Sequence, residues 1–351
     1  MNPNVRKVLR RGVAIPAMPL ALDANRKLDE RRQRALCRYY FAAGAGGLAV
    51  AVHTTQFAIR EAKVGLFEPV LALAAEEFAR ADRGRIEPLV RVAGVVGPTA
   101  QAVAEAERAR DLGYHAGLLS LAALKGAGEA ELIAHCNAVA SVVPVVGFYL
   151  QPAVGGRVLP YSFWRRFAEI ENVVAVKIAP FNRYQTIDVV RAVGEAGRAD
   201  VALYTGNDDN IVMDLVTPYH FGVGSGTAER RIVGGLLGQW AVWTKKAVEL
   251  LEFCHAAANK DELPAVVPRM NVQLTDVNAA VFDASNAFHG CIPGIHEILR
   301  RQGLLENLVT LDERETLGPG QAAEIDRVYR AYPHLNDDAF VAKHRDEWLR
   351  G

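Results

Sequence analysis

Short apolar runs alternate with amphipathic helical stretches from Val13 to about Trp243, and this alternation constrains the fold more than any other feature of the sequence. The runs recur at intervals of about 25 to 35 residues, which is typical of βα units. Eight such units close a (β/α)8 TIM barrel of ~250 residues, an α/β fold, which we predict over residues 10–245. The predicted strands are Val13–Pro16, Gly47–Val52, Pro88–Ala93, Ala116–Leu119, Val145–Tyr149, Val173–Lys177, Val201–Tyr204 and Phe221–Ser225.

An open, doubly wound sheet is the structural alternative, but it normally has a glycine-rich turn after its first strand. Here Pro16-Ala17-Met18-Pro19 follows that strand instead, which favours the barrel. Asp29, Pro98 and Asn207 are predicted helix starts. Beyond Trp243 the pattern is helical only, and we predict a C-terminal helical region over residues 246–351, packed on the barrel or on a partner subunit. Its helical segments are Thr244–Asn259, Asn271–Asn286, Gly294–Gln302, Pro319–Tyr332 and Asp337–Leu349.

The charge balance of the 351 residues excludes several classes of function. Lys and Arg total 40, as do Asp and Glu, so neither a nucleic-acid groove nor a polybasic membrane patch is indicated. No apolar stretch approaches the ~20 residues of a membrane span, and Pro16 and Pro19 interrupt the apolar run that resembles a signal peptide. The four cysteines show no CxxC pairing, as expected for reduced thiols. We therefore expect a cytoplasmic protein.

Lys177 is the most informative residue for chemistry. It ends the apolar run Val173–Val176, which reads as a strand buried on both faces, where an ammonium is costly to desolvate. Burial lowers the pKa of a lysine and makes the amine a nucleophile towards carbonyls. The alternative is a lysine that closes the strand and extends its amine to solvent.

In a barrel, catalytic side chains lie at the C-terminal ends of the strands. Five of the predicted strands end in chemically useful groups: an amine, a phenol, hydroxyls, a carboxylate-rich turn and a glycine-rich segment. In chain order these are His53-Thr54-Thr55-Gln56, Tyr149, Lys177, Tyr204–Asp209 and Gly222–Gly226. The nine histidines are dispersed and no HExxH spacing occurs, so we predict no metal and no cofactor.

Several of these segments resemble the signatures of the dihydrodipicolinate synthase / N-acetylneuraminate lyase family. Tyr149-Leu150-Gln151-Pro152, with Lys177 twenty-eight residues after the tyrosine, resembles its Tyr-x-x-Pro motif and Schiff-base lysine. Thr54-Thr55 is similar to its Gly-Thr-Thr-Gly-Glu turn, and Thr205–Asp209 to its Ser-Gly-Asp-Asp stretch. Gly222–Gly226 resembles its Gly-x-x-Ser strand, and the similarity resumes near Cys291–Leu305.

The resemblance implies a class I aldolase barrel in which Lys177 condenses with a 2-oxo acid such as pyruvate. It implies that Tyr149 is the general acid/base over the imine. Thr54 and Thr55 would bind the substrate carboxylate, with one hydroxyl relaying a proton to Tyr149, and Gly224 would let backbone approach the substrate.

The departures from the family pattern concern recognition of the second substrate. The synthase branch has an arginine five residues after the tyrosine, where this chain has Val154; Arg157 is the possible substitute. The branch also has a tyrosine after the fourth strand, where Leu119–Ala122 contains none. His53 replaces a glycine of the threonine turn and is a candidate for contact with the substrate.

Structural roles compete with these functional ones. Asp208 and Asp209 are predicted to cap the next helix rather than to bind substrate. Gly222-x-Gly-x-Gly could cradle a phosphate, but no lysine or arginine follows it before Arg230. His289 and His296 are predicted to be structural.

We predict a lyase that cleaves or forms a carbon–carbon bond in a 2-oxo acid through a Lys177 Schiff base. The alternatives are a hydro-lyase acting on a deoxy-keto sugar acid and a non-catalytic 2-oxo acid binding barrel. We also expect a homo-oligomer, a dimer or tetramer, because apolar positions at helical spacing in the C-terminal region must be buried against something. These positions are Val277, Ala280, Val281, Ala284, Ile295, Ile298 and Leu299.

Overall fold

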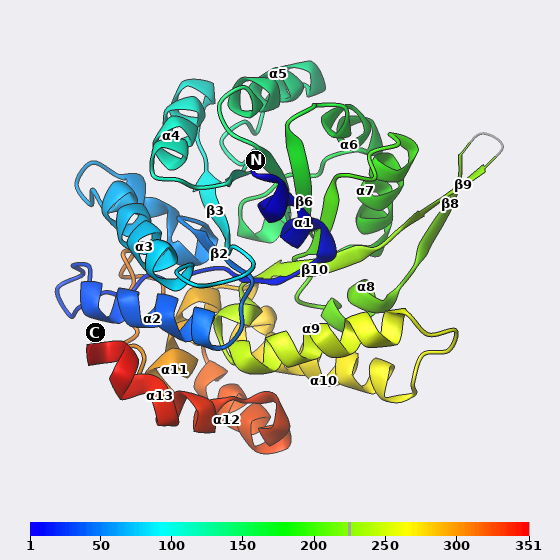
Figure 1. Cartoon of the computed structure of the whole chain (residues 1–351). Helices are drawn as coiled ribbons and strands as arrows, with labels where there is room; N and C mark the ends of the chain where they lie inside the picture. Colours follow the sequence, from blue (N-terminus) through cyan, green and yellow to red (C-terminus); the bar gives the residue numbers. More distant parts are fainter. Residues whose placement is uncertain (224–225, 351) are drawn as a thin grey trace.

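The computed structural model, which describes residues 1–223 and 226–350, contains a closed barrel of eight parallel strands (Figure 1). The order of strands around the barrel is β1-β10-β7-β6-β5-β4-β3-β2. A parallel bridge from Ala17 to Ala49 and a 2.8 Å hydrogen bond from the Met18 N–H to the Ala49 carbonyl join β1 to β2 and close the ring. The strands are β1 Ala14–Pro16, β2 Gly47–Val50, β3 Val90–Val95, β4 Ala116–Leu119, β5 Val145–Leu150, β6 Val173–Ala179, β7 Ala202–Thr205 and β10 Ile232–Leu237.

Eight helices surround the strands, one after each, because a parallel strand pair needs a crossover that covers the sheet. Asp29 starts α2 as predicted, its side chain accepting a hydrogen bond from the Arg32 N–H, and Pro98 precedes α4. The ring consists of α2 Glu30–Ala42, α3 Phe67–Ala81, α4 Thr99–Asp111, α5 Glu129–Ala140, α6 Tyr161–Ala168, α7 Arg183–Glu195, α8 Ile211–Val216 and α9 Thr244–Ala258. The eighth helix thus lies beyond residue 245, where we expected the barrel to end.

The predicted eighth strand, Phe221–Ser225, is wrong. Tyr219–Val223 (β8) pairs antiparallel with Gly226–Arg230 (β9) in a hairpin that projects from the barrel (Figure 1), and residues 224–225 lie outside the described part of the chain. The eighth barrel strand is instead β10, in which five of the six residues are buried. A strand that is buried on both faces has a continuous apolar sequence, so either Ile232–Leu237 or the hairpin strand could be assigned to the barrel from the sequence. In the structure, β10 is the strand that pairs with β1 and β7.

The C-terminal region adds α10 Val266–Val281, α11 Cys291–Arg301, α12 Gln321–Ala331 and α13 Asp338–Arg350. Helix α13 packs along α2, and α12 packs on α10 and α11. The apolar positions expected to need a partner are buried within the chain itself, except Ala284, which is exposed. These positions therefore do not require a second subunit, and the homo-oligomer stays a prediction.

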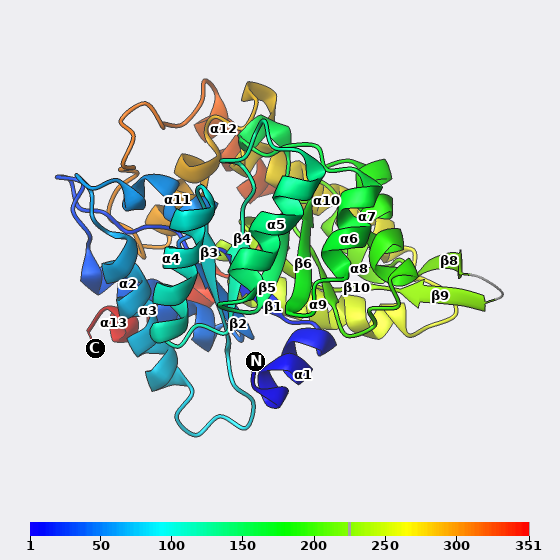
Figure 2. The ribbon, with the colours of Figure 1, turned by 90° about the horizontal axis from the view of Figure 1, so that it is seen from above.

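The two ends of the barrel are covered by different elements. Figure 2 shows α1 (Pro3–Arg11) at one end, and α11 and α12 over the other. Among residues 1–223 and 226–350, no helix is both long enough and apolar enough to cross a membrane. The end beneath α11 is the one at which the functional residues gather.

Candidate active site

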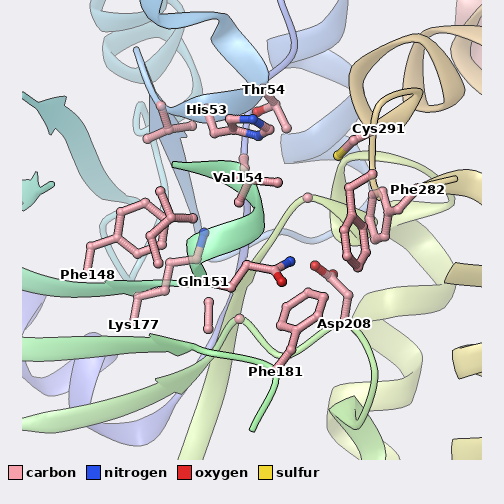
Figure 3. Close-up of a pocket in the computed structure, with 17 residues that line it drawn as sticks. His53, Thr54, Phe148, Gln151, Val154, Lys177, Phe181, Asp208, Phe282 and Cys291 are labelled. Atoms are coloured by element: carbon pink, nitrogen blue, oxygen red, sulfur yellow. The ribbon is translucent and has the colours of Figure 1, made fainter. Parts of the chain in front are cut away.

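A small cavity lies at the C-terminal ends of the barrel strands (Figure 3). The cavity has a volume of about 60 Å3. Its wall is mostly apolar, with four phenylalanines, and combines barrel residues with three from the C-terminal region. The lining residues are Ala17, Val52, His53, Thr54, Phe148, Leu150, Gln151, Val154, Lys177, Ala179, Phe181, Gly206, Asp208, Gly238, Phe282, Phe288 and Cys291.

Lys177 reaches this cavity from β6, as predicted, and its side chain is only 8 % exposed. Its Nζ lies 4.4 Å from the centre of the Phe148 ring. Burial lowers the pKa of the Lys177 amine to about 8, against the opposing influence of Asp208 and Cys291. A larger share of this amine is therefore neutral, and nucleophilic, at physiological pH than of an exposed lysine.

Glycine at position 206 makes room for the Lys177 side chain. A Cβ atom on Gly206 would stand 2.7 Å from Lys177 Cε and 2.8 Å from Ala179 Cβ, far inside ordinary contact distance. The backbone of the loop after β7 can therefore approach the lysine only without a side chain.

Tyr149 does not lie beside Lys177, which contradicts the role expected for it. The Tyr149 hydroxyl donates to the Leu159 carbonyl and accepts from the Leu159 N–H, both at 3.1 Å. Its ring packs on Trp164 of α6, 5.2 Å between centres, on the outer side of the barrel.

The physical reason is a one-residue irregularity between β5 and β6. The register changes from Val145 opposite Val173 to Val146 opposite Ala175, so that Phe148 rather than Tyr149 stands opposite Lys177. The extra residue lies in β6, where the consecutive residues Val174 and Ala175 both pack in the inner cluster, whereas β5 alternates without interruption. Because side chains alternate between the two faces of a strand, this shift places Lys177 on the inner face with Phe148, opposite to the outward face of Tyr149.

The two threonines of the predicted turn have different positions. Thr54 lines the cavity, and its hydroxyl donates to the Met18 carbonyl at 3.2 Å. Thr55 does not line it: its hydroxyl donates to the same carbonyl at 2.7 Å and accepts from the Val52 N–H. The Thr55 N–H is bonded to the Val52 carbonyl. The polar groups of Thr55 thus stabilise the turn, which contradicts their expected direct binding of substrate.

His53 lines the cavity beside Thr54. Burial, and then the charge of Lys177, lower the pKa of the imidazole to about 4, so that it is neutral near pH 7. The turn carries backbone strain, because Ala51 and Gln56, on either side of it, have φ of 59° and 66°. Such left-handed non-glycine residues cluster at functional sites.

Asp208 lines the cavity and does not cap a helix, so the predicted capping role is wrong. Helix α8 begins only at Ile211, with Asn210 at the N-cap position. Burial raises the pKa of the Asp208 carboxyl to about 7, although the charge of Lys177 and the hydrogen bond from the Gln239 N–H both act to lower it.

Asn207, predicted as a helix start, is instead fully buried and holds the loop that carries Asp208. Its side-chain oxygen accepts from the Phe181 N–H at 3.0 Å, and its nitrogen donates to Asp214 at 2.9 Å. The buried Asp214 also accepts from the Thr205 hydroxyl at 2.7 Å.

One further predicted contact, that of Arg157, is not found at the cavity. The guanidinium of Arg157 donates to the carbonyls of Leu124 and Ala127 and so fastens the loop before α5, which contradicts its expected role as a substrate-binding substitute. Val154, by contrast, lines the cavity. Gly224 lies outside the described residues. The described residues hold no group of three or more His, Cys, Asp or Glu side chains suited to a metal ion.

The wall that the C-terminal region contributes to the cavity was not predicted from the sequence. Phe282, Phe288 and Cys291 line the cavity from the segment between α10 and α11. The Phe288 ring meets that of Phe181 edge to face at 5.7 Å, and both residues have left-handed backbone. The similarity expected near Cys291–Leu305 was the only signal that this segment belongs to the site.

Comparison with solved structures shows that this architecture is shared. Dihydrodipicolinate synthase from Aquifex aeolicus superposes with a TM-score of 0.72 at 18% identity, over 93% of this chain and 99% of that one. N-acetylneuraminate lyase from Fusobacterium nucleatum gives 0.68 at 14% identity, over 92% and 99%. YagE, a prophage protein from E. coli K12 solved in complex with pyruvate, gives 0.71 at 16% identity, over 92% and 97%. At these identities the likeness establishes the fold.

The family is identified by comparison of the sequence. No curated protein matches the chain. The profile of the dihydrodipicolinate synthetase family, however, matches residues 11–236. This range includes all eight barrel strands apart from Leu237, the last residue of β10. This chain belongs to the dihydrodipicolinate synthetase family.

Proposed function

We propose that the protein is a lyase that binds a small 2-oxo acid as a Schiff base on Lys177 and makes or breaks a carbon–carbon bond next to the imine. The observation that carries the proposal is the Lys177 amine: it is enclosed in a small apolar cavity at the catalytic end of the barrel, and burial lowers its pKa to about 8.

The chemistry begins with attack of the neutral amine on the C2 carbonyl. Loss of water leaves a C=N bond whose protonated form withdraws electrons from C3. A cavity of about 60 Å3 suits a compact molecule such as pyruvate. The pyruvate complex of YagE, a protein of the same fold, supports this choice.

We expect the second reactant to carry no carboxylate group that would require a cationic side chain for its binding. Val154 stands at the cavity where the synthase branch has arginine, and Arg157 is bonded to backbone carbonyls elsewhere. Among the residues that line the cavity, Lys177 is the one cationic side chain, and imine formation consumes its amine. An aldehyde with an apolar body fits such a wall better than aspartate semialdehyde does.

Borohydride reduction in the presence of pyruvate or a longer 2-oxo acid tests the proposal. Reduction should add the mass of the reduced adduct at Lys177, located by peptide mass spectrometry, and Lys177→Ala should abolish it. Lys246→Ala, which removes a surface lysine paired with Glu249, serves as the matched control. No adduct with any 2-oxo acid, or an adduct on another lysine, would refute the Schiff-base mechanism. An adduct without turnover of any aldehyde would support the binding barrel instead.

A further inference from the structure

A catalytic cycle through the imine must move a proton at C3, and the outward position of Tyr149 leaves that task without the expected phenol. The ionisable side chains that line the cavity are Lys177, His53, Asp208 and Cys291. Lys177 itself is consumed in the imine, so the group that moves the proton must be one of the other three, or water.

Asp208 has the geometry of a base that acts on a molecule held by Lys177. Figure 3 shows the two side chains pointing into the cavity from different sides. Each charge changes the pKa of the other group, yet no ion pair within 4 Å joins them among the described residues. Space for a bound molecule therefore remains between the amine and the carboxylate.

One carboxylate oxygen of Asp208 accepts no hydrogen bond from the part of the chain that the structure describes. Oδ1 is shielded from solvent and has no hydrogen-bond partner in residues 1–223 and 226–350. A buried carboxylate oxygen without a donor is costly, which points to a proton or a substrate group as its missing partner.

The backbone around Asp208 is fixed from both sides. Asn278 of α10 donates to the Asp208 carbonyl at 2.7 Å, and the neighbouring Asn207 is bonded to Phe181 and Asp214. A catalytic group held by such contacts loses little freedom when substrate binds.

The other two candidates suit the task less well. Burial lowers the pKa of His53 to about 4, which makes its neutral imidazole a weak base. Burial raises the pKa of the Cys291 thiol far above neutrality, so that it stays protonated. The pKa of Asp208, raised to about 7, allows this group both to accept and to return a proton near neutral pH.

We propose that the Asp208 carboxylate removes and returns the C3 proton of the 2-oxo acid bound to Lys177, in the place that the resemblance assigned to a tyrosine. The inference rests on the Schiff base proposed above. In the step, an Asp208 oxygen takes the proton from C3, the C–H electron pair becomes the C2=C3 bond, and the C=N π electrons move to nitrogen. The starting species is the protonated imine, so the product is a neutral enamine beside a protonated Asp208, and the reverse step restores the protonated imine.

Exchange of the pyruvate methyl protons in D2O measures this step directly and needs no knowledge of the second reactant. The enzyme should speed the loss of the methyl signal in proton NMR, because each enamine reversal can deliver a deuteron. Asp208→Asn should lower the exchange rate by about 10²–10⁴-fold, the scale of losing a general acid/base, while borohydride still traps pyruvate on Lys177. Asp209→Asn, which changes the neighbouring carboxylate outside the cavity lining, should keep the wild-type exchange rate.

The same samples separate the two proposals. Trapping in wild type and in Asp208→Asn with equal exchange rates would overturn the role of Asp208 and leave the Schiff base intact. Loss of exchange in His53→Gln but not in Asp208→Asn would assign the proton to His53 instead. Absence of trapping in wild type would overturn both proposals. Should Asp208→Asn not fold, Asp208→Ala with added formate gives a second test, in which formate should restore exchange and failure to do so, in a variant that still traps pyruvate, would count against the carboxylate.

Discussion

Gly206→Ala is the sharpest test of how the fold presents Lys177. The added methyl group would stand 2.7 Å from Lys177 Cε and 2.8 Å from Ala179 Cβ, whereas ordinary contacts begin at 3.4 Å. The backbone at this position is held by the hydrogen bond that the Gly206 N–H donates to the Ile178 carbonyl at 2.7 Å. The Lys177 side chain must therefore move by roughly 0.7 Å, and the contact with Ala179 Cβ, which no side-chain rotation can relieve, requires a shift of the backbone as well.

A displacement of about 1 Å costs roughly 100-fold in a reaction that depends on positioning. We expect Gly206→Ala to form the trapped pyruvate adduct about 100-fold more slowly than wild type. Overpacking should also cost about 1–3 kcal/mol of stability, so folding is checked by thermal unfolding and circular dichroism at the assay temperature. The backbone itself tolerates alanine here, since Gly206 is not among the glycines with positive φ.

Gly126→Ala is the matched control, because a Cβ on Gly126 meets nothing within 4 Å and the residue lies outside the cavity lining. It should trap pyruvate at the wild-type rate. A folded Gly206→Ala protein that traps pyruvate as fast as wild type would refute the claim that close backbone approach positions the amine.

The remaining predictions concern pH, Tyr149 and substrate choice. The trapping rate should rise with pH around a midpoint near 8, since burial lowers the Lys177 pKa to about 8 from the ordinary 10.5; a midpoint above 10 would contradict the burial argument. In Asp208→Asn the midpoint should fall further, because the negative charge that favours the ammonium is gone; an upward change would reverse the assigned sign. Tyr149→Phe should retain exchange and trapping but lose about 1–3 kcal/mol in denaturant unfolding, because the buried Leu159 N–H loses its acceptor; a 100-fold loss of exchange would restore the tyrosine to the mechanism. Pyruvate and aspartate semialdehyde should condense poorly in a coupled assay, given Val154 at the cavity; robust synthase activity would overturn that interpretation.

The sequence determined most of the barrel, because strands buried on both faces must be continuously apolar and the helices between them must be amphipathic. Seven of the eight strands lie where the apolar runs predicted them. Lys177 could be identified for the same reason: a charged residue inside such a run is conspicuous. The eighth strand was missed because Phe221 begins an apolar segment close to Ile232–Leu237, and local hydrophobicity does not reveal which of the two segments reaches β1.

The tertiary structure alone decided which side chains face the lysine. With a constant offset along β5 and β6, Val145 opposite Val173 would put Tyr149 opposite Lys177; the register change at Val146 puts Phe148 there. A strand has a period of two, so one extra residue exchanges its faces, and the Tyr-x-x-Pro spacing is unaffected by that exchange. Phe282 and Phe288, distant in sequence, close the cavity only because the C-terminal helices fold back over the barrel. Local patterns thus specify strands, helices and a reactive lysine, whereas the identity of its neighbours depends on register and long-range packing, which no local pattern encodes.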